Sequence, residues 1–282
     1  MKKILLCTDG SAYSAVSCHY AAWLAELAGA SITLLYITDI RQFDVPFVAD
    51  FSGSLGIQPY QDLIGQMRGL ERHKAATIES ASRKTLEHVG FTGEVEFVHR
   101  TGLLVDVLEE MEKDADLLII GKRGASADVA IRHLGSNLER VIRSSYKPCL
   151  VTSRAYHDIS RMLLAYDGSA SCRKAVDFLC AFTPLTECAL HLVTVLTGGQ
   201  SEQAGLDLVN TTESRLKDAG YSVESAVLYG HVDEAIADYV RTEEIGLLIM
   251  GAYGHSRIRN LVIGSTSTTL IRECKIPVLC VR

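Results

Sequence analysis

An internal repeat is the feature of this sequence that most constrains its fold. Residues Lys3–Ser11 read Lys-Ile-Leu-Leu-Cys-Thr-Asp-Gly-Ser, and residues Arg161–Ser169 read Arg-Met-Leu-Leu-Ala-Tyr-Asp-Gly-Ser. Further along each half, Leu-Leu-Ile-Ile-Gly at Leu117–Gly121 corresponds to Leu-Leu-Ile-Met-Gly at Leu247–Gly251. The repeat indicates a tandem duplication, in which one arrangement of elements folds twice.

The chain of 282 residues is long enough for two domains of ordinary size. We expect them at residues 1–154 and 158–282, joined by a short polar connector near 154–160. The first half is longer than the second between its second and fourth predicted strands. Most of the extra residues must lie within 38–68, where glycines and prolines favour irregular or partly helical structure.

Short apolar runs alternate with segments of helical periodicity. In the first half we expect strands near 3–8, 31–37, 94–99, 117–120 and 149–151, and helices near 14–27, 70–88, 105–113 and 135–144. Apolar runs without polar alternation are typical of parallel strands that are buried on both faces. The pattern predicts the α/β class: two tandem flavodoxin-like or Rossmann-like doubly wound domains, each a five-stranded parallel sheet with helices on both faces.

The last strand of each half, at Cys149–Thr152 and Val278–Val281, is short and apolar. An uncovered apolar edge strand promotes aggregation. We therefore expect the halves to associate through these strands as an intramolecular pseudo-dimer, and a homodimer of the whole chain stays open.

Composition and charge exclude several function classes. The net charge of −6 argues against a nucleic-acid partner. The longest apolar runs have the length of strands, so we expect no membrane association. None of the eight cysteines forms a Cys-x-x-Cys pair, and the nine histidines are scattered. These features favour a reducing cytoplasmic location and no protein metal site.

A glycine-rich segment follows the fourth predicted strand of the second half. Gly251 and Gly254 end that strand, and Gly264-Ser265-Thr266 leads into a predicted helix. Glycine lets backbone approach a ligand closely, and unpaired N–H groups at a helix start suit a phosphate. The alternative is a turn whose glycines serve packing and whose hydroxyls cap the helix.

The spacing Gly-x-x-Gly, nine residues, Gly-Ser resembles the nucleotide-binding signature of the universal stress protein family. A weaker copy, Gly121-Lys122-Arg123-Gly124 followed by Gly135-Ser136, extends the resemblance to nearly the whole chain. The resemblance implies a small-molecule nucleotide partner, ATP or a related adenine nucleotide together with Mg²⁺. It also implies a stress-response regulator rather than a fast enzyme.

The resemblance also implies roles for single residues of the second half. Asp167 contacts the adenosine end and the backbone of Val195 contacts adenine. Gly251 and Gly254 line the ribose and phosphates, and the phosphate tail is held by Gly264, Ser265 and Thr266. An N-cap role on the following helix stays open for Asp167, and it is compatible with ligand binding.

The first half departs from the signature. Its matching residues are Asp9, Ile37, Gly121, Gly124, Gly135 and Ser136. Ten residues instead of nine separate Gly124 from Gly135, and Asn137 replaces a hydroxyl. We therefore expect nucleotide binding in the second half only. Lys122, Arg123 and Arg132 are interpreted as solvated surface in preference to anion ligands.

Two other functions stay open. One is a slow ATPase or another enzyme of the same superfold, although no residue is assigned a catalytic role. The other is a scaffold, or a protein that binds an apolar ligand through the extra segment of the first half. That segment carries the apolar residues Phe43, Val45, Phe47, Val48, Phe51, Leu55 and Ile57.

Overall fold

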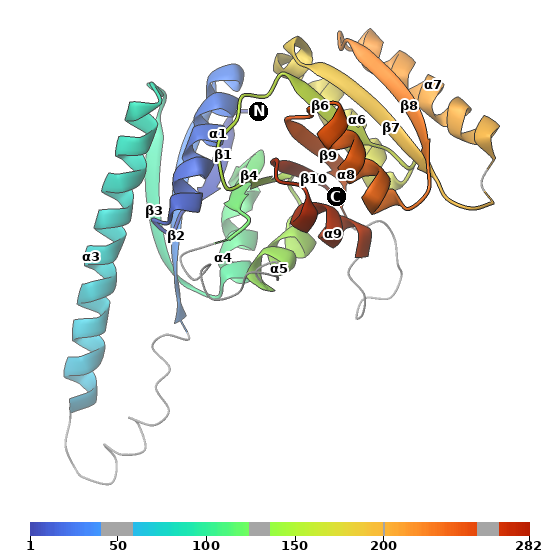
Figure 1. Ribbon diagram of the computed structural model, residues 1–282. Helices are drawn as coiled ribbons and strands as arrows, with labels where there is room; N and C mark the ends of the chain where they lie inside the picture. The colour runs from blue at the N-terminus through green and yellow to red at the C-terminus, as the bar shows by residue number, and fades with distance from the viewer. Residues whose placement is uncertain (41–58, 124–135, 200, 253–264) are drawn as a thin grey trace.

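The computed structural model (Figure 1) describes residues 1–40, 59–123, 136–199, 201–252 and 265–282. Four predicted site residues therefore lie outside the described residues: Gly124, Gly135, Gly254 and Gly264. Arg132 and the apolar segment within 43–57 lie outside them too.

All the described strands form one ten-stranded sheet in the order β3-β2-β1-β4-β5-β10-β9-β6-β7-β8. The first half contributes β1 (Lys3–Cys7), β2 (Ser31–Asp39), β3 (Val95–Gly102), β4 (Leu117–Gly121) and β5 (Cys149–Thr152). The second contributes β6 (Arg161–Ala165), β7 (Ala189–Leu196), β8 (Val223–Tyr229), β9 (Leu247–Gly251) and β10 (Val278–Val281). Within each half every pair is parallel, which confirms the predicted fold class.

Helices cover both faces of the sheet. One face carries α1 (Ala12–Ala28), α3 (Pro59–His88), α6 (Ala170–Ala181) and α7 (Glu202–Asp218). The other carries α4 (Leu104–Met111), α5 (Ser136–Ser144), α8 (Val232–Thr242) and α9 (Ser265–Glu273). Two short 3₁₀ turns, η2 (Glu112–Asp114) and η4 (Thr183–Glu187), follow α4 and α6. Neighbouring residues of one strand serve opposite faces: Ile4 and Leu6 belong to the first core, and Leu5 to the second.

The two halves meet at an antiparallel pair, in which Val278, Leu279 and Cys280 lie opposite Val151, Leu150 and Cys149. This confirms the expected association through the last strands. Every residue of β5 and β10 is buried, so each half covers the edge of the other.

The connector between the halves is held against α1. The Tyr20 hydroxyl hydrogen-bonds with Ser153 Oγ at 3.2 Å and accepts from the His157 N–H at 3.2 Å. The Tyr156 ring packs on Tyr20 at 4.8 Å between centroids. The β5–β10 pair, called the seam below, is therefore reinforced by a second contact that lies outside the sheet.

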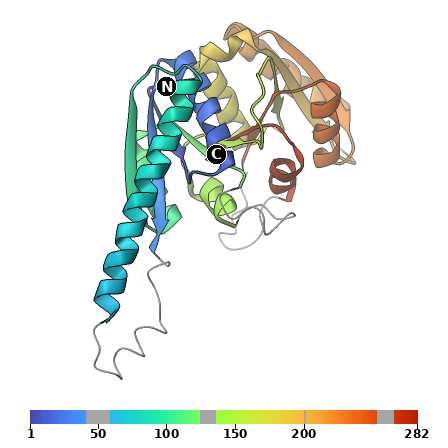
Figure 2. The ribbon, with the colours of Figure 1, turned by 60° about the vertical axis from the view of Figure 1, so that its left-hand side comes forward.

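Helix α3 begins earlier than the sequence suggested. We expected regular helix from about Leu70, but α3 starts at Pro59, a residue suited to a first helical turn. It has 30 residues, whereas α7 at the same place in the second half has 17. In Figures 1 and 2 the N-terminal part of α3 extends beyond the strands. Part of the extra length of the first half is therefore helix.

Candidate functional site

The candidate sites lie where the strand order of each half reverses. In the order 3-2-1-4-5, the reversal falls between β1 and β4, and in the second half between β6 and β9. Ligands of open α/β sheets bind at the carboxyl ends of such strands. Ala165 of β6 pairs with Met250 of β9. Asp167, two residues beyond β6, and Gly251, the last residue of β9, therefore lie at adjacent strand ends. The structure thus brings these two predicted residues to one edge.

Asp167 is exposed beyond the end of β6, and its Oδ1 accepts from the Ser169 N–H at 2.8 Å. Partial loss of water around this carboxyl raises its pKa, but the hydrogen bonds that it accepts from Ser169 outweigh that effect and lower the pKa below the usual range. Asp167 is therefore ionised at neutral pH.

Asp167 does not cap α6. The N-cap is Ser169, whose Oγ accepts from the Cys172 N–H at 3.3 Å, and Ser11 caps α1 in the same way. The N-cap interpretation of Asp167 is thus wrong, because the serine two residues later takes that role.

Gly251 ends β9 in close contact with the start of α6. A Cβ at this position would lie 2.7 Å from Ser171 Oγ and 2.8 Å from the Cys172 backbone nitrogen. Any side chain would displace α6 from the sheet. This contact alone requires glycine here, so packing against α6 accounts for Gly251 whether or not a ligand is bound.

Val195 lies in β7, beyond the point at which β6 ends. The last registered pair of the two strands is Ala165 with Val193, and Val195 pairs onward with Leu228 of β8. The Val195 side chain packs at the second core. Its backbone therefore lies at the same edge of the sheet as Asp167.

Helix α9 begins at Ser265, and Thr266 in its first turn is half-buried. The Oγ1 atom of Thr268 is buried and has no hydrogen-bond partner in the described part of the chain. A buried hydroxyl usually has a partner, so an unpartnered one is unusual. Sequence reasoning missed Thr268. The run Ser-Thr-Ser-Thr-Thr was a usable signal, since threonine is a weak helix former.

The first half carries a hydrogen-bonded cluster near the carboxyl ends of β2 and β3. Tyr36 and Thr38 both donate to Glu71 Oε2 of α3, at 2.9 and 3.0 Å. Thr38 Oγ1 also lies 2.8 Å from His99 Nε2. Since Thr38 gives its proton to Glu71, the His99 Nε2–H is the donor in that contact.

Lys74 on the next turn of α3 brings a positive charge close to Asp9. A hydrogen bond with Tyr36 raises the pKa of the Lys74 ammonium, and the charges of Glu71 and Asp9 raise it further. Along the repeat, Ala204 of α7 takes the place of Lys74 in the second half. The two halves are therefore chemically different at this place in the repeat.

Lys122 corrects another expectation. It is half-buried, and its Nζ donates to the carbonyl oxygens of Cys274 and of Ile276, the latter at 3.2 Å. It is not solvated surface as predicted, because the two carbonyls belong to the other half of the chain and draw the ammonium into the seam.

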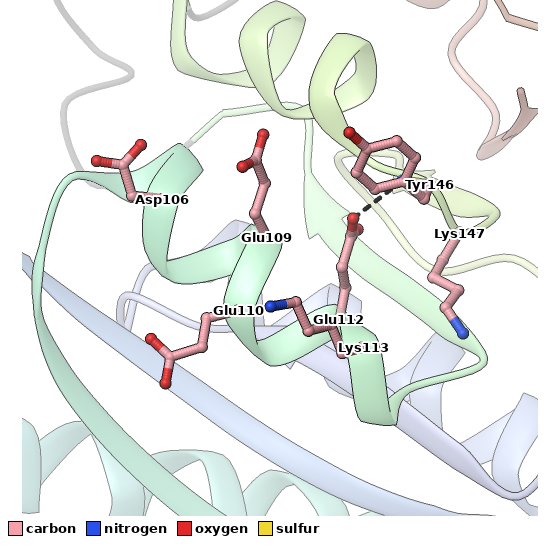
Figure 3. Close-up of a pocket in the computed structure, with 7 residues that line it drawn as sticks. All are labelled: Asp106, Glu109, Glu110, Glu112, Lys113, Tyr146 and Lys147. Carbon is pink, nitrogen blue, oxygen red and sulfur yellow. Dashed lines mark hydrogen bonds between the residues drawn. The ribbon is translucent and has the colours of Figure 1, made fainter.

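A cavity of about 590 Å³ lies between α4 and the segment after α5 (Figure 3), away from the two strand-order reversals. Its lining is Asp106, Glu109, Glu110, Glu112, Lys113, Tyr146 and Lys147. Glu112 is buried and is already engaged by the Ser145 hydroxyl at 2.6 Å and the Tyr146 N–H at 2.9 Å. Four carboxyl groups against two ammonium groups would repel a phosphate.

Among the described residues no helix is long and apolar enough to cross a membrane. The His, Cys, Asp and Glu side chains of these same described residues include no group of three or more that could hold a metal ion.

Comparison with known proteins gives a consistent result over the whole chain. The Universal stress protein family matches residues 1–153 and again residues 159–282. The universal stress protein Slr1230 of Synechocystis is 45% identical over 289 residues and covers 100% of both chains.

Solved structures resemble this fold over its full length. A universal stress protein from Archaeoglobus fulgidus superposes with a TM-score of 0.74 at 22% identity, covering 99% of this chain and 98% of that one. A Pseudomonas aeruginosa protein described as a candidate universal stress protein has a TM-score of 0.64 at 15% identity, covering 100% and 93%. At these sequence identities, the two similarities show a shared fold and nothing further.

Proposed function

The chain belongs to the universal stress protein family, and from that premise we propose that its second half binds an adenine nucleotide, ATP or a close relative. We further propose that the nucleotide regulates the protein's part in a stress response. The observation that carries the proposal is the buried Oγ1 of Thr268 in the first turns of α9, which has no hydrogen-bond partner among the described residues.

The chemistry of the second half suits a nucleotide lying across the β6 and β9 ends. An ionised Asp167 accepts hydrogen bonds from a ribose hydroxyl or an adenine amino group, and it would repel phosphates. The start of α9 has the opposite character, with first-turn N–H groups that have no partner within the helix, the positive end of a helix dipole and threonine hydroxyls. Asp167 thus suits the adenosine end of a nucleotide, and the start of α9 suits its phosphate end.

Mg²⁺ would accompany the phosphates. This cation keeps several waters and takes few protein ligands when it binds with a nucleotide. In this proposal the protein holds the phosphates and the phosphates hold the cation.

The experiment is Thr268→Val, with ATP affinity measured by isothermal titration calorimetry. Because Thr268 Oγ1 has no described partner, valine should leave the stability unchanged while removing a hydrogen bond to phosphate. A charge-assisted bond contributes about 1.5–3 kcal/mol, so affinity should fall roughly tenfold or more.

The matched control is Thr211→Val in α7, whose hydroxyl is exposed and donates to the Asp207 carbonyl at 2.8 Å. It should bind ATP as the unchanged protein does. If Thr268→Val also binds ATP normally, the assignment of phosphate to the start of α9 is wrong. Mass spectrometry of the small molecule that co-purifies would identify the nucleotide.

A further inference from the structure

Lys122 occupies an unexpected place for a residue of a nucleotide-binding motif. It directly follows Gly121 at the end of β4, where the family signature would approach a ligand. Its Nζ instead donates to the carbonyls of Cys274 and Ile276, just after the last turn of α9 in the other half. The main chain of the same turn is tied to the seam strand β5, because the Lys122 N–H donates to the Thr152 carbonyl at 3.3 Å.

The contact places a positive charge at the carboxyl end of α9. The last carbonyls of a helix have no partner within the helix, and they carry the negative end of its dipole. Cys274 directly follows α9 and Ile276 lies two residues further on, so Lys122 binds two carbonyls of the turn that leaves the helix and places its charge near the negative end of the helix dipole. The titratable groups whose charge would act on the ammonium are the Cys274 and Cys280 thiols. Burial raises the pKa of both thiols, that of Cys280 to about 12, so neither is an anion near pH 7.

Among the described residues of the second half, no lysine makes the corresponding contact with the first half. The residue matching Lys122 is Ala252, which is buried and uncharged. The end of α5 is engaged by other groups: Arg282 Nη1 donates to the Arg143 carbonyl, and Glu112 accepts from Ser145 and Tyr146. The lysine contact therefore runs from the first half to the second only.

We infer that the Gly121–Arg123 turn of the first half is a clamp on the phosphate-binding helix of the second, and that Lys122 is a positioning residue for nucleotide binding. This inference rests on the proposed function. The two ends of α9, which has 9 residues, lie roughly 13 Å apart at 1.5 Å per residue. Fixing the carboxyl end of so short and rigid an element fixes the orientation of its amino end.

The clamp also gives a physical reason for the altered first-half motif. A lysine that points into the seam cannot serve a ligand at the carboxyl end of β4. Its turn now stabilises the neighbouring site. The first half thereby contributes to nucleotide affinity without binding a nucleotide.

The test compares Lys122→Met and Lys122→Arg with Lys113→Met, an exposed lysine of the same half. ATP and adenosine affinities are measured by calorimetry on the full chain. Lys122→Met should weaken ATP about tenfold and change adenosine less than twofold, because only the phosphate end is mispositioned. Lys122→Arg, which keeps donors for both carbonyls, should restore most of the ATP affinity, and Lys113→Met should have no effect.

Hydrogen exchange provides a readout that needs no ligand. Lys122→Met should accelerate exchange of the Leu270 and Ile271 amides in α9 and leave α5 unchanged. If the methionine variant does not fold, Lys122→Gln, which keeps a single donor group, replaces it and should give an intermediate effect.

Three results would overturn the clamp: unchanged ATP affinity in a folded Lys122→Met, an equal loss for ATP and adenosine, or unchanged exchange in α9. Absence of ATP binding by the unchanged protein would instead refute the proposed function, and the exchange measurement would still decide the clamp.

Discussion

Cys149 and Cys280 lie directly opposite each other in the antiparallel pair that joins β5 to β10. They belong to the seam at which two parallel half-sheets become one sheet, and both cores continue across it from one half into the other. The halves are thus complementary surfaces, and each depends on the other for a covered edge.

Separating the halves should expose that edge. Residues 1–154 and 158–282, produced alone, should self-associate or precipitate, since β5 and β10 would each present an unpaired apolar strand. Produced together, they should form a one-to-one complex on size-exclusion chromatography with light scattering. Two soluble, monomeric halves would show that the domains do not need the seam.

Glu112 should be important for the stability of the first half. Glu112→Ala leaves the Tyr146 N–H without its partner, which costs about 1–3 kcal/mol, and removes the bond from the Ser145 hydroxyl, which keeps only its contacts with Lys147. We expect urea unfolding to report a loss of roughly 2–4 kcal/mol. The control is Glu109→Ala on the adjoining helix, whose exposed side chain should matter by less than about 0.5 kcal/mol. Equal effects of the two changes would contradict this account of Glu112.

Lys122 should leave a signature in the pH dependence of stability. Burial lowers the pKa of its ammonium to about 8 from a usual value of 10.5. Above pH 8 the folded protein has therefore lost a proton that the unfolded chain still holds, so this group makes unfolding less favourable as pH rises toward 10.5.

The measurement compares the unfolding free energies of the unchanged protein and Lys122→Met. Relative to the variant, the unchanged protein should gain about 2 kcal/mol between pH 7 and pH 9.5, at about 1.4 kcal/mol per pKa unit. A relative stability that falls with pH would mean that the Lys122 pKa is not lowered.

Much of the fold could be predicted because its causes are local and repeated. Apolar runs such as Leu117–Gly121 and Leu247–Gly251 can only be strands buried on both faces, and they recur in the same order. The pairing of β5 with β10 could also be predicted, because each strand would be an uncovered apolar edge if its half stood alone. The early start of α3 did not, because Pro59 and the glycines after it are as compatible with a turn as with a first helical turn.

The side chains that the sequence did not reveal act across long separations. Lys122 looks like a surface residue until the carbonyls of Cys274 and Ile276 are placed beside it. Glu112 lies in an ordinary charged run, and its burial depends on the segment after α5. The residues in each contact are far apart in the sequence and follow no repeating spacing, so no pattern within one segment could indicate the contact.

Asp167 should affect one end of the nucleotide only. Asp167→Ala removes the carboxylate proposed to bind the adenosine moiety, so ATP and adenosine should both weaken by about tenfold, as expected for one lost charge-assisted bond. Binding of inorganic tripolyphosphate should be unaffected or slightly stronger, because a negative charge has been removed. Calorimetry with the three ligands distinguishes the ends, and a loss confined to tripolyphosphate would reverse the proposed orientation.

The central claim is that nucleotide binding belongs to the second half alone, and the stoichiometry of ATP binding tests it most directly. Calorimetry on the full chain should give one strong site per chain, and a double change of Asp167→Ala with Thr268→Val should abolish it. The first-half change Asp9→Ala should leave that site intact. Two equivalent sites per chain, or a strong site that persists in the double variant, would contradict the account.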